Sequence, residues 1–302
     1  MTLDDAYATR LERLRQAWHP NPDKPEESPE NTLLALGWTA AGAPRSAVAA
    51  AGAEAPALDG AALQRLDRLL ASRIAGVPLA HLTGRQHFLG LELLAGPDAL
   101  IPRKETELLA RAAIDLARDT GATRAIEPCT GSGNLALALA HHVGGLAVHG
   151  SDLSATAVAL ARRNAAMLGL EGRVDFRDGD LLAPFDTPQF HARVDLVVCN
   201  PPYISSAKVA AMAPEISGHE PRLAFDGGTL GVSILTRLMH DAPRLLRAGG
   251  WLAFEVGRGQ GAAMARRLGN DGAWDEVREC TDGDGAVRVV LARRSTDEGE
   301  AA

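Results

Sequence analysis

The chain has 302 residues, of which 46% are hydrophobic, and it carries a formal net charge of −7. This length predicts one large or two modest domains with a substantial core. An acidic chain does not attract duplex DNA by bulk charge, so we expect no duplex DNA partner. Its 3 cysteines are too few for a disulfide framework, and no apolar run is long enough to span a bilayer. We therefore expect a soluble cytoplasmic protein with no membrane partner.

The first part of the chain predicts a small helical domain. Residues 3–18 place Tyr7, Leu11 and Leu14 on one helical stripe. A loop or linker rich in proline and charge follows at 19–30, and residues 31–75 have the alanine- and leucine-rich pattern of short packed helices. This region contains no recognisable catalytic motif.

A connecting segment then leads into the rest of the chain. Residues 86–101 alternate as two strands would, with Gly96-Pro97-Asp98 as the predicted turn of a hairpin. A helical stripe begins at Lys104. We accordingly place the helical domain at 1–84, the connecting hairpin at 85–103 and the second domain at 104–302.

The second domain repeats a pattern of strand, glycine-rich turn and helix, which is typical of α/β folds. Strands are predicted at 124–128, 146–151, 173–177, 194–199 and 250–256. The end differs, because "WDEVRECT", "DGDG" and "AVRVVLARR" form a strand, a tight turn and a strand. The predicted fold is therefore a seven-stranded, mostly parallel Rossmann-like sheet with a C-terminal antiparallel hairpin, preceded by the helical domain.

"AIEPCTGSGNLALALA", residues 125–140, has the form of a strand, a glycine turn and a helix. Gly131 and Gly133 allow the backbone to turn tightly and to approach a ligand whose polar end meets the free N–H groups of the helix. Asp152 ends the next predicted strand, where a carboxylate binds ribose hydroxyls. The string also fits the dinucleotide pattern G-x-G-x-x-A, so a nicotinamide-dependent dehydrogenase stays open.

Two features favour S-adenosylmethionine over a dinucleotide. Glu127 precedes the glycines, where it would repel a pyrophosphate and attract a cationic methionine group. The terminal hairpin also departs from the doubly wound dinucleotide fold. Asp180 follows the third predicted strand, within reach of an adenine amino group, although a helix cap or turn carboxylate is an equal interpretation of Asp180.

"VDLVVCNPPYIS", residues 194–205, runs from a buried strand directly into Asn200, two prolines and Tyr203. Asn200 and Pro201 both precede proline, which holds them extended. Neither proline has an N–H to donate, so the Asn200 side-chain oxygen and the Pro201 carbonyl are acceptors at fixed spacing. Two such acceptors suit a planar –NH₂ group, on which Tyr203 can stack. The motif thus predicts transfer of a methyl group to a planar nitrogen, with catalysis mainly by positioning.

The chain resembles the HemK/PrmC family, S-adenosylmethionine-dependent methyltransferases that act on the amide nitrogen of a glutamine in translation proteins, notably release factors. The resemblance runs from about Gly76 to Leu291 and rests on the blocks "PLAHLTGRQHFLGLEL", "LIPRKETE", "EPCTGSGN", "GSDLS", "DLVVCNPPYIS", "HEPRLAFDGG" and "GGWLAFEVGRGQ". It implies a class I methyltransferase sheet and, as partner, a release factor or ribosomal protein.

The resemblance also implies a set of site residues. Asn200 and the Pro201 carbonyl would hold the target amide beside Tyr203, and these three are the predicted catalytic residues. Predicted cofactor contacts are Glu127, Cys129, Thr130, Gly131, Ser132, Gly133, Asp152, Leu153, Asp180, Leu181 and Asn200. Predicted contacts to the acceptor are Phe88, Arg103, Asn200, Pro201, Pro202, Tyr203 and Glu220. For Arg103, a solvated charge that answers nearby glutamates is an equally good interpretation. We expect no metal, since the histidines form no metal-spaced cluster.

Three alternatives stay open from the sequence. Lys104 stands where the family usually has proline, and the N-terminal domain matches only loosely. Both departures favour methylation of a free small molecule with a planar amide or guanidinium nitrogen. A nucleic-acid amino methyltransferase is disfavoured by the acidic charge. A cofactor-binding adaptor without activity should have lost Asn200 or Tyr203, and the chain keeps both.

Overall fold

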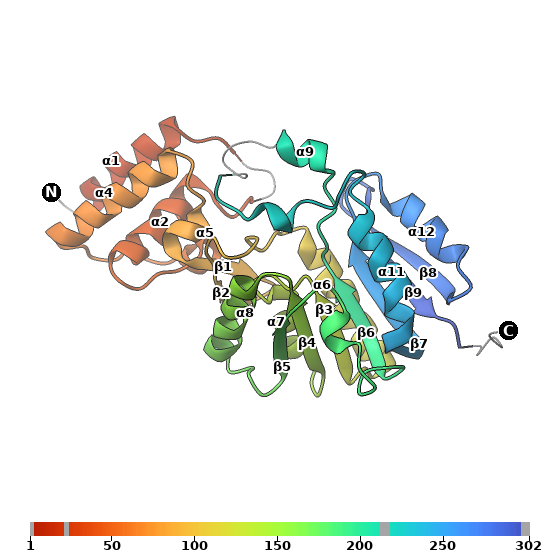
Figure 1. Ribbon diagram of the computed structural model, residues 1–302. Helices are drawn as coiled ribbons and strands as arrows, with labels where there is room; N and C mark the ends of the chain where they lie inside the picture. The colour runs from red at the N-terminus through yellow and green to blue at the C-terminus, as the bar shows by residue number, and fades with distance from the viewer. Residues whose placement is uncertain (1–2, 21–23, 212–217, 297–302) are drawn as a thin grey trace. The chain divides into compact units, whose positions relative to one another are not determined.

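The computed structural model describes residues 3–20, 24–211 and 218–296. The chain divides into two compact units (Figure 1). The described residues of Met1–Lys104 and Ala213–Glu220 form the first unit, and those of Glu105–Met212 and Pro221–Ala302 form the second. The first unit holds the red and orange helices of Figure 1, and the second holds the large sheet.

The first unit is largely helical, as the sequence predicts. Its helices are α1 (Leu3–Gln16), α2 (Pro29–Ala40), α3 (Ala47–Ala50), α4 (Gly60–Ile74) and α5 (Leu79–Thr83). Polar side chains cap the starts of α2 and α4, since Ser28 accepts a hydrogen bond from Asn31 N and Asp59 accepts one from Ala62 N. The core consists of buried apolar side chains on facing helices, including Leu14, Leu33, Leu36, Leu66, Leu70 and Leu79.

The connecting hairpin is present, but its predicted turn is wrong. β1 (Arg85–Phe88) pairs antiparallel with β2 (Leu91–Leu94), and Phe88 lies opposite Leu91. The two residues between the strands have positive φ, 47° at Leu89 and 85° at Gly90, which is the backbone of a two-residue hairpin turn. Gly96-Pro97-Asp98 lies beyond β2. The error arose because leucine rarely adopts such a conformation, so Gly-Pro-Asp was the stronger turn signal.

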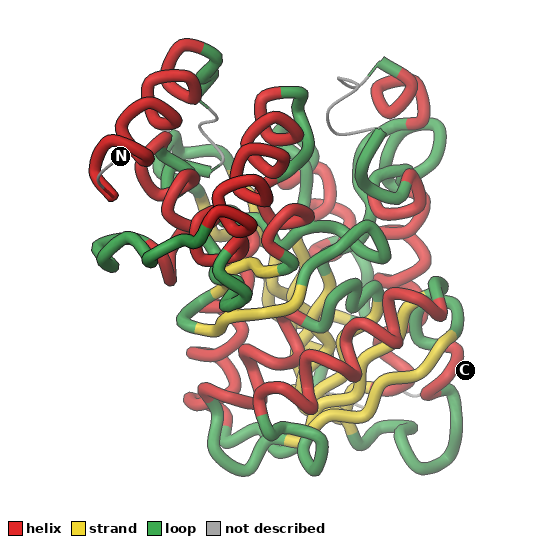
Figure 2. The backbone as a smooth tube through the Cα atoms, turned by 90° about the vertical axis from the view of Figure 1, so that its left-hand side faces the viewer, coloured by secondary structure: helices red, strands yellow, loops and turns green. Residues whose placement is uncertain are grey.

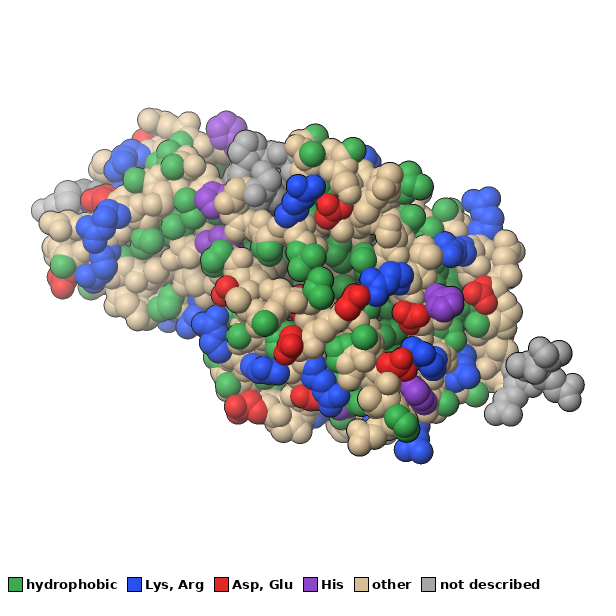
Figure 3. All heavy atoms as spheres, in the orientation of Figure 1, with side chains coloured by type: hydrophobic (Ala, Val, Ile, Leu, Met, Phe, Trp, Pro, Cys, Tyr) green, Lys and Arg blue, Asp and Glu red, His purple; other side chains and the backbone are tan. Residues whose placement is uncertain are grey.

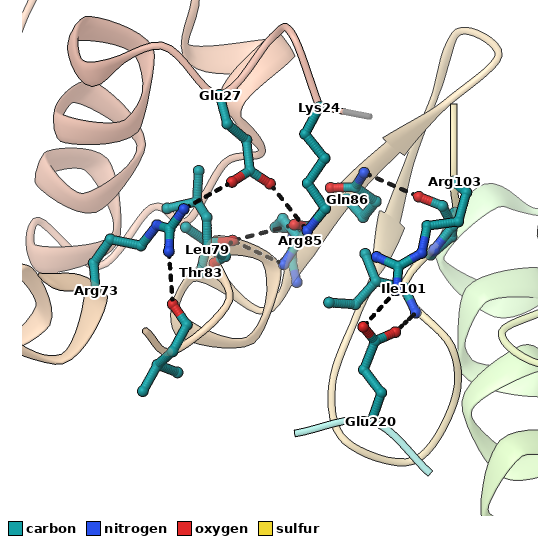
Figure 4. Close-up of polar contacts among 12 residues, drawn as sticks. Lys24, Glu27, Arg73, Leu79, Thr83, Arg85, Gln86, Ile101, Arg103 and Glu220 are labelled. Carbon is teal, nitrogen blue, oxygen red and sulfur yellow. Dashed lines mark hydrogen bonds and ion pairs between the residues drawn. The ribbon is translucent and has the colours of Figure 1, made fainter. Parts of the chain in front are cut away.

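Glu220 is fixed within the first unit by two hydrogen bonds (Figure 4). Arg103 Nη2 donates to its Oε1 at 2.6 Å, and Ile101 N donates to its Oε2 at 2.9 Å. Only 2% of the Glu220 side chain is exposed. Gln86 Nε2 adds a bond to the Pro102 carbonyl at 3.2 Å. Arg103 and Glu220, both predicted to contact the acceptor, thus neutralise each other.

Glu27, also shown in Figure 4, is a second buried carboxylate that pairs with cationic side chains. Glu27 lies between Lys24, at 3.5 Å, and Arg73, at 3.4 Å. All three side chains are mostly buried. They link the segment before α2 to the end of α4.

The second unit contains the predicted sheet. Its strand order in the described residues is β5-β4-β3-β6-β7-β9-β8. The strands are β3 (Arg124–Pro128), β4 (Ala147–Asp152), β5 (Val174–Asp178), β6 (Val194–Cys199), β7 (Leu246–Glu255), β8 (Trp274–Thr281) and β9 (Val287–Arg294). The first five run parallel, and β9 pairs antiparallel with both β7 and β8. The predicted C-terminal hairpin is therefore confirmed, with β9 between β7 and β8.

Helices pack beside this layer of strands (Figure 2). They are α6 (Thr106–Thr120), α7 (Asn134–His142), α8 (Ala155–Leu168), α11 (Ser233–Leu245) and α12 (Gly261–Gly269). The second unit also contains the short helix α9 (Ser206–Ala210) and 3₁₀ turns at Ala183–Phe185 and Arg222–Ala224. α11 and α12 share a buried core with alternate residues of β6 and β7, among them Val197, Cys199, Leu252 and Phe254. The strands at the centre are buried on both faces, which explains their continuous apolar runs.

Charged side chains of both signs are interspersed on the face of the molecule shown in Figure 3. No helix among the described residues is long and apolar enough to cross a membrane. Within the same residues, no group of three or more His, Cys, Asp or Glu side chains is placed to hold a metal ion.

Replacing Glu220 with alanine should strongly destabilise the first unit. The change leaves Arg103 without its partner in a largely buried position, which costs about 3–5 kcal/mol of unfolding free energy in comparable cases. Glu30→Ala is the matched control, because Glu30 pairs with Arg15 at the surface of the same unit at 2.7 Å. That exposed pair should contribute less than about 1 kcal/mol. Urea unfolding compares the two, and equal losses would contradict a structural role for Glu220.

Candidate active site

Two loops at the carboxyl edge of the sheet carry most of the predicted site residues. β3 pairs in parallel with both β4 and β6, so strand order reverses direction at this point. The glycine loop, Cys129–Gly133, leaves the end of β3, and the elbow, Asn200–Tyr203, leaves the end of β6. Parallel neighbours end at the same edge, so the two loops lie together where open α/β sheets bind ligands.

The glycine loop turns back on itself through residues with positive φ, which is 60° at Cys129, 55° at Gly131 and 84° at Gly133. Thr130 N donates to the Ser151 carbonyl at 2.9 Å, and Gly133 N donates to the Thr130 carbonyl at 2.8 Å. The loop leads directly into α7, whose N-cap residue, Gly133, has no side chain to cap the helix. Ala136 N, in the first turn, donates to Glu127, and the N–H groups before it can meet an anionic group.

Glu127 lies beneath this loop and supports it. Its Oε2 accepts hydrogen bonds from Thr130 Oγ1 at 2.5 Å and from Ala136 N at 2.9 Å. Only 1% of the residue is exposed, and burial raises the pKa of its carboxyl well above the usual value. One oxygen thus links the glycine loop to the first turn of α7.

Asp152 ends β4 and joins the glycine loop from the neighbouring strand. Its Oδ2 accepts from Gly131 N and its Oδ1 from Ser154 N, both at 2.9 Å. Burial raises the pKa of Asp152, while these N–H donors oppose the shift. An ionised carboxylate has about four acceptor positions, so capacity remains for two hydroxyl groups. The next residue, Leu153, is 60% exposed beside it.

Asp180 and Leu181 follow β5. Arg237 Nη2 of α11 donates to Asp180 Oδ2 at 2.6 Å, and both side chains are about half exposed. Leu181 has a φ of 48°, and its carbonyl accepts a hydrogen bond from Ser151 Oγ. The Asp180 carboxylate is thus engaged by a cation, while the Leu181 side chain is buried.

The amide of Asn200 is held in one orientation. Its Nδ2 donates to Thr106 Oγ1 at 3.0 Å, and Thr106, at the start of α6, is 1% exposed. The amide oxygen Oδ1 points away from Nδ2 and therefore away from Thr106. Asn200 is partly exposed and Pro201 is buried. The elbow thus has an acceptor in the orientation that an –NH₂ group requires.

Tyr203 has its hydroxyl directed into the protein. The hydroxyl donates to Glu255 Oε1 at 2.9 Å and accepts from Arg288 Nη2 at 3.3 Å. Burial and the neighbouring Glu255 carboxyl raise the pKa of Tyr203 far above the usual range. Because the hydroxyl is occupied, the part of Tyr203 left for another group is its ring.

Residues 225–227 hold the backbone that follows the elbow. Ile204 N donates to the Phe225 carbonyl at 3.0 Å, and Gly227 N donates to the Ile204 carbonyl at 2.8 Å. A Cβ at Gly227 would lie 2.6 Å from the Pro202 carbonyl oxygen. Gln260 Nε2 also donates to the Tyr203 carbonyl at 3.0 Å. The elbow is therefore fixed from both sides.

The buried cysteine near the site, Cys199, remains a thiol. Cys199 is fully buried at the end of β6, beside Cys129 of the glycine loop. Burial, with a smaller contribution from the Cys129 thiol, raises the pKa of Cys199 well above its usual value. Cys199 is thus a small apolar core residue, because only a thiolate is nucleophilic.

The structure brings the glycine loop, Asp152 and the elbow together within the second unit. Phe88, Arg103 and Glu220, three of the predicted acceptor contacts, belong to the first unit. Phe88 is fully buried there.

A methyltransferase-domain family model matches residues 125–219. The release factor glutamine methyltransferase of Moorella thermoacetica is 39% identical over 241 residues, which are 80% of this chain and 82% of that protein. The protein of the same name from Streptomyces coelicolor is 40% identical over 233 residues, covering 75% and 79%. This chain belongs to the release factor glutamine methyltransferase family.

Solved structures with a similar fold are also methyltransferases. The hMettl16 catalytic domain in complex with the MAT2A 3'UTR hairpin 6 matches with a TM-score of 0.53 at 17% identity, covering 76% of this chain and 82% of that one. A human methyltransferase 10 domain containing protein matches with a TM-score of 0.51 at 18% identity, covering 69% and 90%. At these identities the likeness shows the fold alone, and it confirms the class I methyltransferase fold.

Three residues that contact the elbow carry no role predicted from the sequence. Thr106, Glu255 and Arg288 received no role, although they contact Asn200 or Tyr203. Thr106 and Glu255 lie in "LIPRKETE" and "GGWLAFEVGRGQ", two of the blocks that carry the family resemblance. A glutamate inside an apolar strand was the available signal, because a carboxylate is rarely buried without a partner.

Gly133→Ala should destabilise the protein more than Gly121→Ala. Both glycines have positive φ, but only Gly133 has neighbours that a Cβ would meet. A Cβ at Gly133 would lie 2.9 Å from the ring of Phe176 and 3.1 Å from Ala161. Gly121, with φ of 63°, has nothing within 4 Å of such a Cβ. Gly121→Ala should cost about 1–2 kcal/mol for backbone conformation alone, and Gly133→Ala about 1–3 kcal/mol more. Urea unfolding measures both, and equal costs would show that the glycine loop has room for a side chain.

Proposed function

We propose that this protein transfers a methyl group from S-adenosylmethionine to the side-chain amide nitrogen of a glutamine in a peptide chain release factor. Family membership supports the reaction and the substrate. The observation that carries the proposal is the fixed amide of Asn200, whose nitrogen is held by Thr106. That substrate would place the protein in the cytoplasm, where release factors act.

The glycine loop and Asp152 fit S-adenosylmethionine. The N–H groups that precede Ala136 at the start of α7 suit the carboxylate of the methionine group, and Asp152 has capacity for two ribose hydroxyls. Ser132 Oγ, in the same loop, is buried and has no hydrogen-bond partner in the described structure. When bound, S-adenosylmethionine supplies an electrophilic methyl group on a sulfonium.

The elbow would hold the acceptor amide. Asn200 Oδ1 and the Pro201 carbonyl accept its two hydrogens, which turns the face of the nitrogen toward the cofactor side of the site. The ring of Tyr203 covers the plane of the amide, because its hydroxyl is bound to Glu255. An amide nitrogen is a weak nucleophile, so positioning supplies much of the rate, about 7–11 kcal/mol in favourable cases.

We further propose that the helical first unit recognises the release factor. It contributes none of the glycine loop or the elbow, and the family relatives extend over most of the chain. Hydrogen exchange with and without a release factor tests this point. Amides of α1–α5 should become protected, and protection confined to the second unit would exclude this role.

Wild-type protein with labelled S-adenosylmethionine should methylate one glutamine of a purified bacterial release factor. Asn200→Ala should lower kcat about 30- to 1,000-fold, the effect of about 2–4 kcal/mol of lost transition-state positioning, while cofactor affinity changes little. Parallel assays contain ribosomal proteins and free glutamine or arginine. Transfer to one of these but not to the release factor would overturn the substrate assignment.

Asn200→Asp is a sharper test of the same contact. It keeps the shape and one acceptor oxygen but places a negative charge beside a cationic cofactor. Methyl transfer should fall while cofactor binding is kept or strengthened. A variant with more than about half of the wild-type rate would show that the elbow is only a turn.

Asp152→Ala should weaken binding of S-adenosylmethionine and of its demethylated product about 10- to 150-fold, as expected for the loss of a charge-assisted hydrogen bond. Calorimetry measures the two dissociation constants. Asp178→Ala is the control, because Asp178 also ends a strand, β5, and is exposed. Unchanged affinity in Asp152→Ala would mean that the carboxylate only closes the turn at Ser154.

A further inference from the structure

A buried polar cluster lies directly behind the elbow in the second unit. Thr106 and Glu255 are each 1% exposed and Arg288 is 9% exposed. Thr106 accepts from Asn200 at 3.0 Å, and Glu255 accepts from Tyr203 at 2.9 Å. Arg288 lies 3.5 Å from Glu255 and donates to the Tyr203 hydroxyl at 3.3 Å. The cluster therefore touches both side chains of the elbow.

Stability alone is a weak reason for such a cluster. A buried ion pair is often no more stabilising than apolar side chains of the same volume, because both charges lose their hydration. The buried polar atoms here are in addition incompletely paired, since Arg288 Nε has no hydrogen-bond partner in the described structure. The specific result of the arrangement is that the Asn200 amide and the Tyr203 ring each have one orientation.

The orientation of the Asn200 amide decides which group the acceptor meets. An asparagine side chain can rotate by half a turn and exchange its oxygen with its –NH₂ group at little cost. In the exchanged orientation a donor would face the –NH₂ group of the substrate, and binding would be repulsive. Thr106 prevents this exchange as long as its hydroxyl accepts from Asn200 rather than donates to it.

The direction of that hydrogen bond depends on the hydroxyl proton of Thr106. Glu255 Oε2 is buried without a hydrogen-bond partner in the described structure, and the Thr106 hydroxyl lies near enough to lower the pKa of the carboxyl. An ionised Glu255 would attract the hydroxyl proton of Thr106 and leave the oxygen of Thr106 to accept from Asn200. The same carboxylate accepts the proton of the Tyr203 hydroxyl.

We propose that Thr106 and Glu255 are positioning residues for methyl transfer, Thr106 by fixing the amide of Asn200 and Glu255 by orienting Thr106 and Tyr203. The inference rests on the proposed function, because it assigns these residues to the acceptor side of that site. Neither residue touches the reacting atoms.

The titration of Glu255 makes the arrangement sensitive to pH. Burial raises the pKa of Glu255 to about 7, while Thr106, Tyr203 and Arg288 lower it and Glu105 raises it further. A carboxyl with a raised pKa is ionised only above that value. The attraction of an ionised Glu255 for the Thr106 proton is therefore present above about pH 7 and weakens as pH falls through it.

Thr106→Val and Thr106→Ser separate positioning from packing. Valine keeps the volume and removes the acceptor oxygen, so kcat should fall about 10- to 100-fold while the dissociation constant for S-adenosylmethionine stays within about 3-fold. Serine keeps the hydroxyl and should restore most of the rate. Thr120→Val, on the same helix, is the matched control, because the Thr120 hydroxyl donates to the Leu116 carbonyl one turn back and, among the described residues, contacts neither Asn200 nor Glu255 through a hydrogen bond.

A second measurement keeps the inference testable without methyl transfer. In protein labelled with ¹⁵N-asparagine, the Asn200 –NH₂ signals are assigned by their loss in Asn200→Asp. Their hydrogen exchange should be slow in wild type and in Thr106→Ser and fast in Thr106→Val. If the release factor is not methylated but this pattern is observed, the proposed substrate fails and the assignment of Thr106 stands.

Glu255→Gln tests the role of Glu255. It also provides a test of the inference if Thr106→Val does not fold. The rate should fall, and the loss of activity below about pH 7 should disappear from the kcat profile. Three results would overturn the inference: Thr106→Val with more than half of the wild-type rate, Thr106→Ser as slow as Thr106→Val, or an unchanged acid limb in Glu255→Gln.

Discussion

The parallel pairing of β3 with β6 is the constraint on which the site depends. It carries the glycine loop and the elbow to the same edge of the sheet, although 67 residues of sequence numbering separate Gly133 from Asn200. β7 pairs with β6 on its other side and ends at Glu255, so the support of the elbow arrives at the same edge. Three neighbouring strands thus bring the glycine loop, the elbow and the buried carboxylate to one edge of the sheet.

The fold of the second unit could be predicted because its signals are local. Continuous apolar runs, glycines that end strands and a short turn near the end give strands within a few residues of those observed. The turn of the first hairpin could not be predicted, since Leu89 adopts a positive φ that leucine rarely takes. That conformation depends on the pairing of Phe88 with Leu91, which is not visible in the residues of the turn itself.

The local geometry of the candidate site could be predicted where one residue type has few structural uses. Asn200 before two prolines, and Gly131 and Gly133 before a helix, have few other interpretations. Thr106 had no such signal, because a threonine at the start of a helix is ordinary and its partner lies 94 positions away. Arg103 was a predicted acceptor contact, but in the structure it pairs with the Glu220 carboxylate of its own unit.

The elbow is rigid, and its own residues, Asn200–Tyr203, include no basic side chain. In the proposed function, a basic side chain beside the acceptor would compete for the hydrogens that Asn200 and Pro201 would accept. The prolines remove competing N–H donors, and the Tyr203 hydroxyl is withdrawn to Glu255. The ionisable groups nearest the acceptor therefore stand behind the elbow, where they act on orientation. A site of this kind selects its acceptor by the geometry of a planar –NH₂ group, and its activity depends on how firmly one amide is kept from rotating.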